Sequence, residues 1–129
     1  DYPAWGLKPS RFAGMPSHDH NRLIASVVID ADMRREVARE IAARLKQARG
    51  PLHLAIPLQG IEEWDRPGAP LHDPQGLQAF TTEMQAADCG PASVQPLDAH
   101  INDRAFTDHV LQVFDTWCAQ GLIQKAPHA

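Results

Sequence analysis

Three short apolar runs, each followed by a helical pattern, constrain the fold of this chain more than any other feature. The runs cover residues 23–29, 52–58 and 93–99, and each has the length of a strand. Runs that are apolar at nearly every position are typical of strands covered on both faces, as in a parallel sheet. A helix between two parallel strands forms a right-handed crossover. We therefore predict an α/β fold: a three-layer, Rossmann-like domain with a short parallel sheet and the element order β-α-β-α-β-α.

The three helical patterns have recognisable starts. Asp30 and Asp73 are good N-caps, and Pro74 occupies the first helical position after the second of them. Asn102 is the expected N-cap of the third helix, which puts Asp103 in the first turn, where a negative charge complements the helix dipole. Apolar residues at helical spacing are expected to face the core. In chain order they are Met33, Val37, Ile41 and Leu45; Leu77, Phe80 and Met84; and Phe106, Val110, Phe114 and Trp117.

The chain divides into an arm, a domain and a tail. Residues 1–22 contain several prolines and glycines and are expected to form an extended N-terminal arm. Residues 23–121 are the α/β domain, and residues 122–129 are a mobile tail. The chain starts with Asp1 rather than methionine, and three strands make a narrow sheet. We therefore expect a piece of a longer polypeptide, whose sheet is completed by upstream sequence or by a partner.

Composition narrows the class of partner. The formal net charge is -4 with neutral histidines, so we expect no nucleic-acid partner and no anionic membrane surface. No apolar run approaches the ~20 residues that span a bilayer, and no signal peptide is visible. Cys89 and Cys118 lie far apart in sequence, which favours two free thiols in the cytoplasm over a disulfide. The exposed edges of so narrow a sheet favour a homo-oligomer.

The candidate functional residues follow from the topology. Parallel strands end at one edge of a sheet, which is where ligands bind in open α/β folds. The ends of the second and third predicted strands, with the start of the second helix, therefore bring one set of ligand-binding candidates together. They are Gln59, Gly60, His72, Asp73, His100, Asn102 and Asp103. Helix N-termini at this edge would offer backbone N–H groups to a carboxylate or a phosphate.

Among these candidates, His72 and His100 are the two whose presence local structure does not explain. Asp73, Asn102 and Asp103 serve as helix caps or first-turn charges with or without a ligand. Of the two, His100 is the candidate acid–base residue, although a histidine at such an edge is more often a hydrogen-bonded support. His18 and His20 precede the first strand and are expected near the opposite edge unless the arm folds over, so we expect no metal site. No HExxH, GxSxG, Walker A or GxGxxG motif occurs.

Several short motifs also occur together in one known family. They are His20-Asn21, Pro57-Leu58-Gln59-Gly60, Asp65, Pro67-Gly68, Pro70-Leu71-His72-Asp73-Pro74 and His100-Ile101-Asn102-Asp103. In this order and spacing they resemble the C-terminal part of the tomato-mosaic-virus-resistance-protein-like ATP-binding family. The chain departs from the family pattern at Arg22, where a proline is usual, at Glu62, where a serine is usual, and at Arg104, which replaces a proline.

The resemblance implies a two-lobed α/β protein, of which this chain is the end of the second lobe. It implies ATP as a cofactor of the full-length protein, with the glycine-rich segments in the missing N-terminal lobe and no cofactor held by this piece alone. Three interpretations follow. The chain is a ligand-binding lobe, for a nucleotide or a phosphate-containing metabolite, that is not catalytic on its own; or it supplies His100 to an active site between the lobes; or it is a protein-interaction module without a small-molecule site.

Overall fold

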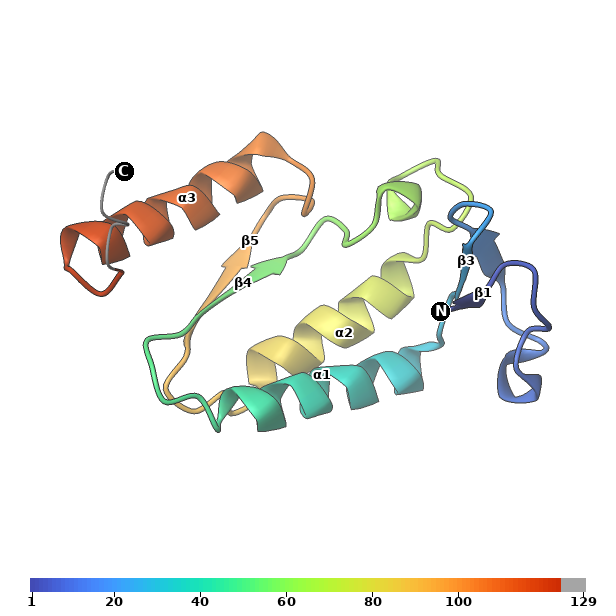
Figure 1. Cartoon of the computed structure of the whole chain (residues 1–129), viewed down its shortest axis with the longest axis horizontal. Coiled ribbons are helices and arrows are strands. Elements are labelled where there is room, and N and C mark those ends of the chain that lie inside the picture. Colours follow the sequence, from blue (N-terminus) through green and yellow to red (C-terminus); the bar gives the residue numbers. More distant parts are fainter. Residues whose placement is uncertain (124–129) are drawn as a thin grey trace, which may run out of the picture.

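The chain is a mixed α/β domain with a short parallel sheet. The computed structural model, shown in Figure 1, describes residues 1–123. Two parallel strands, β4 (His53–Pro57) and β5 (Ser93–Leu97), form the sheet. Helix α3 (Arg104–Ala119) covers one face, and helices α1 (Ala31–Leu45) and α2 (Pro74–Ala86) lie on the other (Figure 1). The predicted α/β class, three layers and element order are confirmed. Of the predicted tail, residues 124–129 lie outside the described part.

The first predicted strand does not join the parallel sheet, so that expectation was wrong. Strand β3 (Ile24–Val27) instead forms an antiparallel sheet with β1 (Tyr2–Pro3) and β2 (Ser17–Asp19). Ala25 pairs with Tyr2 on one side and with Asp19 on the other. The N-terminal arm therefore supplies both neighbours of β3, and their nearness in sequence makes this pairing entropically cheap. A 3-10 turn at Ser10–Phe12 lies between the two arm strands.

The core lies between the sheet and the α1–α2 pair. Ala38 and Ala42 of α1 are buried, and they form one cluster with Ile56, Met84 and Cys89. The two alanines belong to the buried cluster itself, whereas the larger Ile41 and Leu45 pack against its outside. The predicted core stripe of α1 is therefore displaced by about one position: Met33, Ile41 and Leu45 are only partly buried, and Val37 is 42% exposed.

Two of the three predicted caps are confirmed. The Asp30 side chain accepts a hydrogen bond of 2.9 Å from the backbone N–H of Met33. The Asp73 side chain accepts one of the same length from Gly76. Pro74 follows as the first residue of α2, as expected. The third helix begins one residue later than predicted, because α3 starts at Arg104 with Asp103 at its N-cap position.

Helix α3 is the least buried element of the three layers. None of its residues is buried, and Val110 and Phe114 of its predicted core stripe are 43% and 49% exposed. No helix within residues 1–123 is long and apolar enough to cross a membrane. Both cysteines are free thiols, as predicted: Cys89 is buried and Cys118 is half-buried.

Candidate functional site

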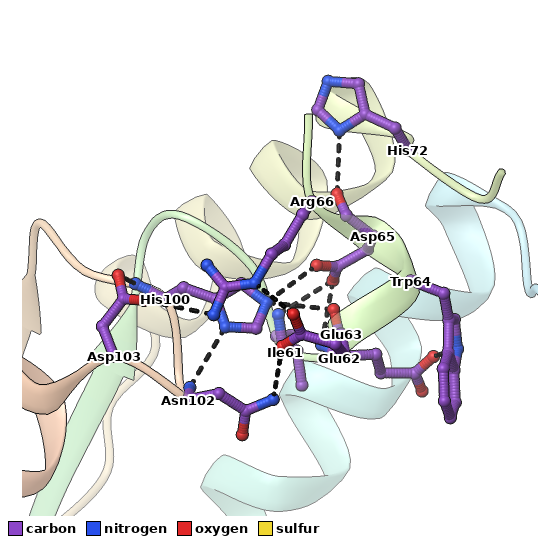
Figure 2. A network of polar contacts seen from close by, with 10 residues as sticks. All are labelled: Ile61, Glu62, Glu63, Trp64, Asp65, Arg66, His72, His100, Asn102 and Asp103. Atoms are coloured by element: carbon purple, nitrogen blue, oxygen red, sulfur yellow. Dashed lines mark hydrogen bonds and ion pairs between the residues drawn. The ribbon is translucent and has the colours of Figure 1, made fainter. Parts of the chain in front are cut away.

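His100 lies at the turn between β5 and α3, and its ring is 1% exposed. Its Nδ1 atom accepts a hydrogen bond of 3.1 Å from the backbone N–H of Asn102. Nδ1 therefore carries no hydrogen, and the ring hydrogen of the neutral imidazole is on Nε2. Nε2 lies 2.9 Å from the carbonyl oxygen of Glu62 and 3.2 Å from Oδ1 of Asp65 (Figure 2). Both ring nitrogens are thus engaged inside the protein.

Gly60 makes room for this imidazole. Its φ angle is +133°, a backbone conformation that favours glycine. A Cβ atom at this position would overlap the His100 ring and the Asp65 carboxylate. The Gly60 carbonyl also accepts a hydrogen bond of 3.0 Å from the backbone N–H of Ile101. Gly60 and His100, predicted as neighbours from the strand order, do lie together.

Asp65 organises the loop that covers His100. Its Oδ2 atom accepts hydrogen bonds from the backbone N–H groups of Ile61, at 2.8 Å, and Glu62, at 3.1 Å. These bonds fold the start of the loop into a capping box and a 3-10 turn, Glu63–Asp65. The backbone carbonyl of Asp65 accepts a hydrogen bond of 2.8 Å from Nδ1 of His72. His72 therefore holds the far side of the same loop and is itself exposed.

Asn102 is not the cap of α3, and that prediction was wrong. Its backbone N–H points at His100, and its side-chain amide donates a hydrogen bond of 3.0 Å to Oε2 of Glu63. Asn102 thus ties the strand-to-helix turn to the loop instead of capping the helix. This bond, together with the Arg66 guanidinium, lowers the pKa of the Glu63 carboxyl.

Asp103 and Arg66 complete the network that Figure 2 shows. Oδ2 of Asp103 accepts a hydrogen bond of 3.0 Å from the backbone N–H of His100. Its Oδ1 atom pairs at 3.1 Å with Arg66, which also pairs at 2.8 Å with Glu63. The His100 N–H, followed by Arg66, lowers the pKa of the Asp103 carboxyl. The turn at 100–103 and the loop at 61–66 are therefore joined by charged and neutral contacts.

The other two candidates lie outside this network. Gln59 donates a side-chain hydrogen bond to Asp98, next to the strand ends. Asp73 forms an ion pair with Arg34 of α1, at 3.1 Å, while it caps α2. Five of the seven predicted ligand-binding residues thus gather around one loop, and their role toward a ligand stays a prediction.

A pocket of about 300 Å³ lies on the other side of this loop, and sequence reasoning missed it. It is bordered by the end of β3, by α1 and α2, and by the loop. Its walls are Ser26, Val27, Val28, Ile29, Arg34, Val37, Ile41, Ile61, Glu62, Trp64, Asp65, Leu71 and Phe80. Most of these are apolar, and they come from segments far apart in sequence. The only signal available beforehand was the length of the 61–72 loop, because long loops are often functional.

The histidines of the arm lie beside this pocket. The rings of His18 and His20 have centroids 4.4 Å and 5.1 Å from that of Trp64, which lines the pocket. The expectation that they lie at the opposite edge was wrong, because the arm folds back over the loop. Trp64 itself donates a hydrogen bond of 2.6 Å from Nε1 to Glu62. Across residues 1–123, no three side chains of the metal-binding kinds converge.

The arrangement leaves neither ring nitrogen of His100 free for proton transfer. His100 is buried with both nitrogens engaged, so in this geometry it positions the loop and does not face a substrate. The pocket offers apolar walls, with polar groups that are already in use. The guanidinium of Arg34 pairs with Asp73 and donates a hydrogen bond of 3.0 Å to the carbonyl of Ile29. The Asp65 carboxylate is held by backbone N–H groups.

The fold and the network define a class: an α/β domain in which hydrogen bonds and ion pairs join a strand-to-helix turn to a long loop beside an apolar pocket. Comparison with known proteins then gives the family. The chain belongs to the uncharacterised protein family UPF0261, whose C-terminal domain matches residues 1–118. This agrees with the resemblance found in the sequence motifs.

The relatives are longer proteins. A UPF0261 protein of Brucella melitensis is 46% identical over 125 residues, which cover 97% of this chain and 30% of the relative. The ToMV resistance protein Tm-1(GCR237) of Solanum lycopersicum is 26% identical over 108 residues, which cover 82% of this chain and 14% of the relative. The chain thus spans about a third or less of the length of these proteins.

Proposed function

We propose that this chain is the ligand-binding lobe of a longer, two-lobed α/β protein. Its pocket would take the planar, mostly apolar part of a small molecule, such as the base of a nucleotide. The observation that supports this most is the partly open pocket of about 300 Å³ with walls from β3, α1, α2 and the 61–72 loop. That volume lies at the lower end for small-molecule sites, so it suits a ring system better than a whole nucleotide.

The charged side chains that line the pocket indicate where the phosphates of such a nucleotide would lie. Arg34 is neutralised by Asp73, and Glu62 and Asp65 bring carboxylates to the pocket wall. A phosphate placed inside would meet these carboxylates without a free cation to balance it. The phosphates of a nucleotide would therefore lie outside the pocket, toward the other lobe. The resemblance to an ATP-binding family agrees with this division of the ligand.

The His100 network has a supporting role in this proposal. It holds the loop whose residues Glu62, Trp64 and Asp65 form one wall of the pocket. Because His100 has no ring nitrogen free, the lobe is proposed to bind without catalysing a reaction on its own. A rigid loop keeps the pocket formed before the ligand arrives, which reduces the entropy lost on binding.

Calorimetric titration of the protein in its natural length tests this proposal. The titrants are adenosine, ATP and inorganic phosphate. Val28→Phe fills the pocket, while Val110→Phe makes the same substitution on α3 at a position that is 43% exposed. We expect adenosine and ATP to bind, inorganic phosphate to give no heat, and Val28→Phe alone to weaken binding at least about tenfold.

Two outcomes would overturn the proposal. If adenosine and ATP give no heat with a folded protein, the interaction-module interpretation is favoured. If both valine variants bind as tightly as the wild type, the ligand binds elsewhere. Thermal unfolding of each variant shows whether the fold survives the substitution.

A further inference from the structure

Two histidines outside the loop network join the last helix to the sheet. His53 lies on β4 and His109 on α3, and their Nε2 atoms are 2.9 Å apart. Nδ1 of His53 lies 2.6 Å from Oγ of Ser93 on β5. Two imidazole nitrogens at this distance share a hydrogen, with one ring as donor and the other as acceptor. The contact therefore requires at least one of the two Nε2 atoms to be unprotonated.

Apart from the histidine pair, the residues of α3 that lose exposure are half-buried apolar ones, Phe106, Val113, Trp117 and Cys118. The helix has no buried residue. Because side chains alternate along a strand, the sheet face toward α3 carries His53, Ala55, Pro57, Ser93, Gln95 and Leu97. Leu97, at the end of β5, is the one large apolar residue among these six. Within residues 1–123, the histidine pair is the only side-chain hydrogen bond between this helix and the sheet. Loss of the hydrogen bond between the two histidines should therefore affect the whole helix.

The charged groups around the pair do not offset an extra positive charge. His53 is the only titratable side chain of β4, and β5 has none. On α3, Asp108 is paired with Arg104 at 3.4 Å, and the remaining acidic group is Asp115, six residues beyond His109. A second positive charge on the pair would thus meet its neighbour imidazolium without a nearby carboxylate to balance it.

We propose that the His53–His109 pair is an acid-sensitive latch that holds α3 on the sheet. With one shared hydrogen, or with one added proton, the two rings attract each other. When both rings are fully protonated, each presents an N–H to the other, and the like charges repel. The helix then leaves the sheet and exposes the sheet face beneath it.

The direction of the pH effect follows from the pKa of His53. Burial, and then the neighbouring His109, lower that pKa from its ordinary value of 6.5. A lowered pKa means that the released state takes up the proton more readily than the latched state. Release is therefore opposed above pH 6.5 and increasingly favoured as the pH falls below it.

Hydrogen exchange followed by mass spectrometry tests the latch on the protein in its natural length. Protection of residues 104–119, corrected for the intrinsic effect of pH, is compared at pH 7.5, 6.5, 5.5 and 5.0. We expect wild-type protection of α3 to fall at acid pH, by up to about tenfold per pH unit for one coupled proton, while α1 stays protected. In His109→Gln the amide can still bond but adds no second positive charge, so this fall should be smaller than in the wild type, leaving only the part caused by the burial of His53.

The control is His72→Gln, which changes an exposed histidine away from α3 and should keep the wild-type pH response. The proposal is overturned if wild-type protection of α3 does not change with pH, or if His109→Gln shows the same loss. Imidazole ¹⁵N shifts of the wild type give a second readout that does not depend on a variant. They must titrate over the same pH range as the loss of α3 protection, and titration in a different range would also overturn the latch.

Discussion

His100 shows how a residue with catalytic chemistry can be used for structure. Its two ring nitrogens join the Glu62 carbonyl, the Asp65 carboxylate and the Asn102 N–H, and it is almost wholly buried. A buried polar group with all its partners stabilises one arrangement of the chain, because leaving any partner unpaired costs free energy. The imidazole thus specifies where the loop lies relative to the turn.

Gly60→Ala tests that packing at a single residue. The new Cβ would overlap His100 and Asp65, and alanine is strained at the φ of +133°. We expect a loss of about 2 kcal/mol or more in the free energy of unfolding, measured by urea denaturation. Gly50→Ala is the matched control, because nothing lies within 4 Å of its added Cβ, and it should change stability by less than about 1 kcal/mol. Equal effects of the two substitutions would contradict the close packing of Gly60 on His100.

Among the helices and strands, sequence patterns predicted where a helix starts better than they predicted which element packs beside it. Asp30 and Asp73 cap as expected because capping is decided within four residues. The partners of β3 and the core face of α1 depend on contacts made elsewhere in the chain. An apolar run does not say which strand lies next to it, and on α1 the small Ala38 and Ala42 are buried whereas the larger Val37 is 42% exposed.

The candidate site was predicted only in part, because it also depends on contacts between residues that lie far apart in the sequence. Parallel strand ends brought Gly60 and His100 together as expected, because the topology of β4 and β5 requires it. Asn102 has the residue type of a cap but is bound to Glu63, a contact across 39 positions that local patterns do not contain. The pocket needs the end of β3, two helices and the loop at once, so only the folded chain shows it.

The contacts between the turn at 100–103 and the loop at 61–66 predict that the free energy of unfolding depends on pH. The pKa of Asp103 is lowered by the His100 N–H and Arg66, so its ionised form stabilises the fold above the ordinary value of 3.8. This contribution is lost as the pH falls below that value, toward the lowered pKa. We expect Asp103→Asn to be less stable than the wild type at pH 7 and to approach it near pH 3, by urea denaturation. Asp108→Asn, at an exposed ion pair, is the control for charge; a constant difference for Asp103→Asn across this range would count against these contacts.

At the scale of the whole molecule, the chain combines a well-packed half with a lightly held one. The α1–α2 pair and the inner face of the sheet form the core, and the pocket opens between this half and the arm sheet. On the other face, α3 has no buried residue. The chain spans 30% of the length of its Brucella relative, so the proposed ligand would be shared with the rest of a longer protein.

We propose above that this chain binds the planar part of a small molecule in the pocket that Trp64 lines. Amide chemical-shift mapping by NMR during addition of adenosine tests the location directly. We expect the largest shifts for residues 26–29, 34, 61, 62, 64, 65 and 71, with little change in α3. Shifts centred away from these residues, or no shifts at millimolar adenosine, would contradict this proposal.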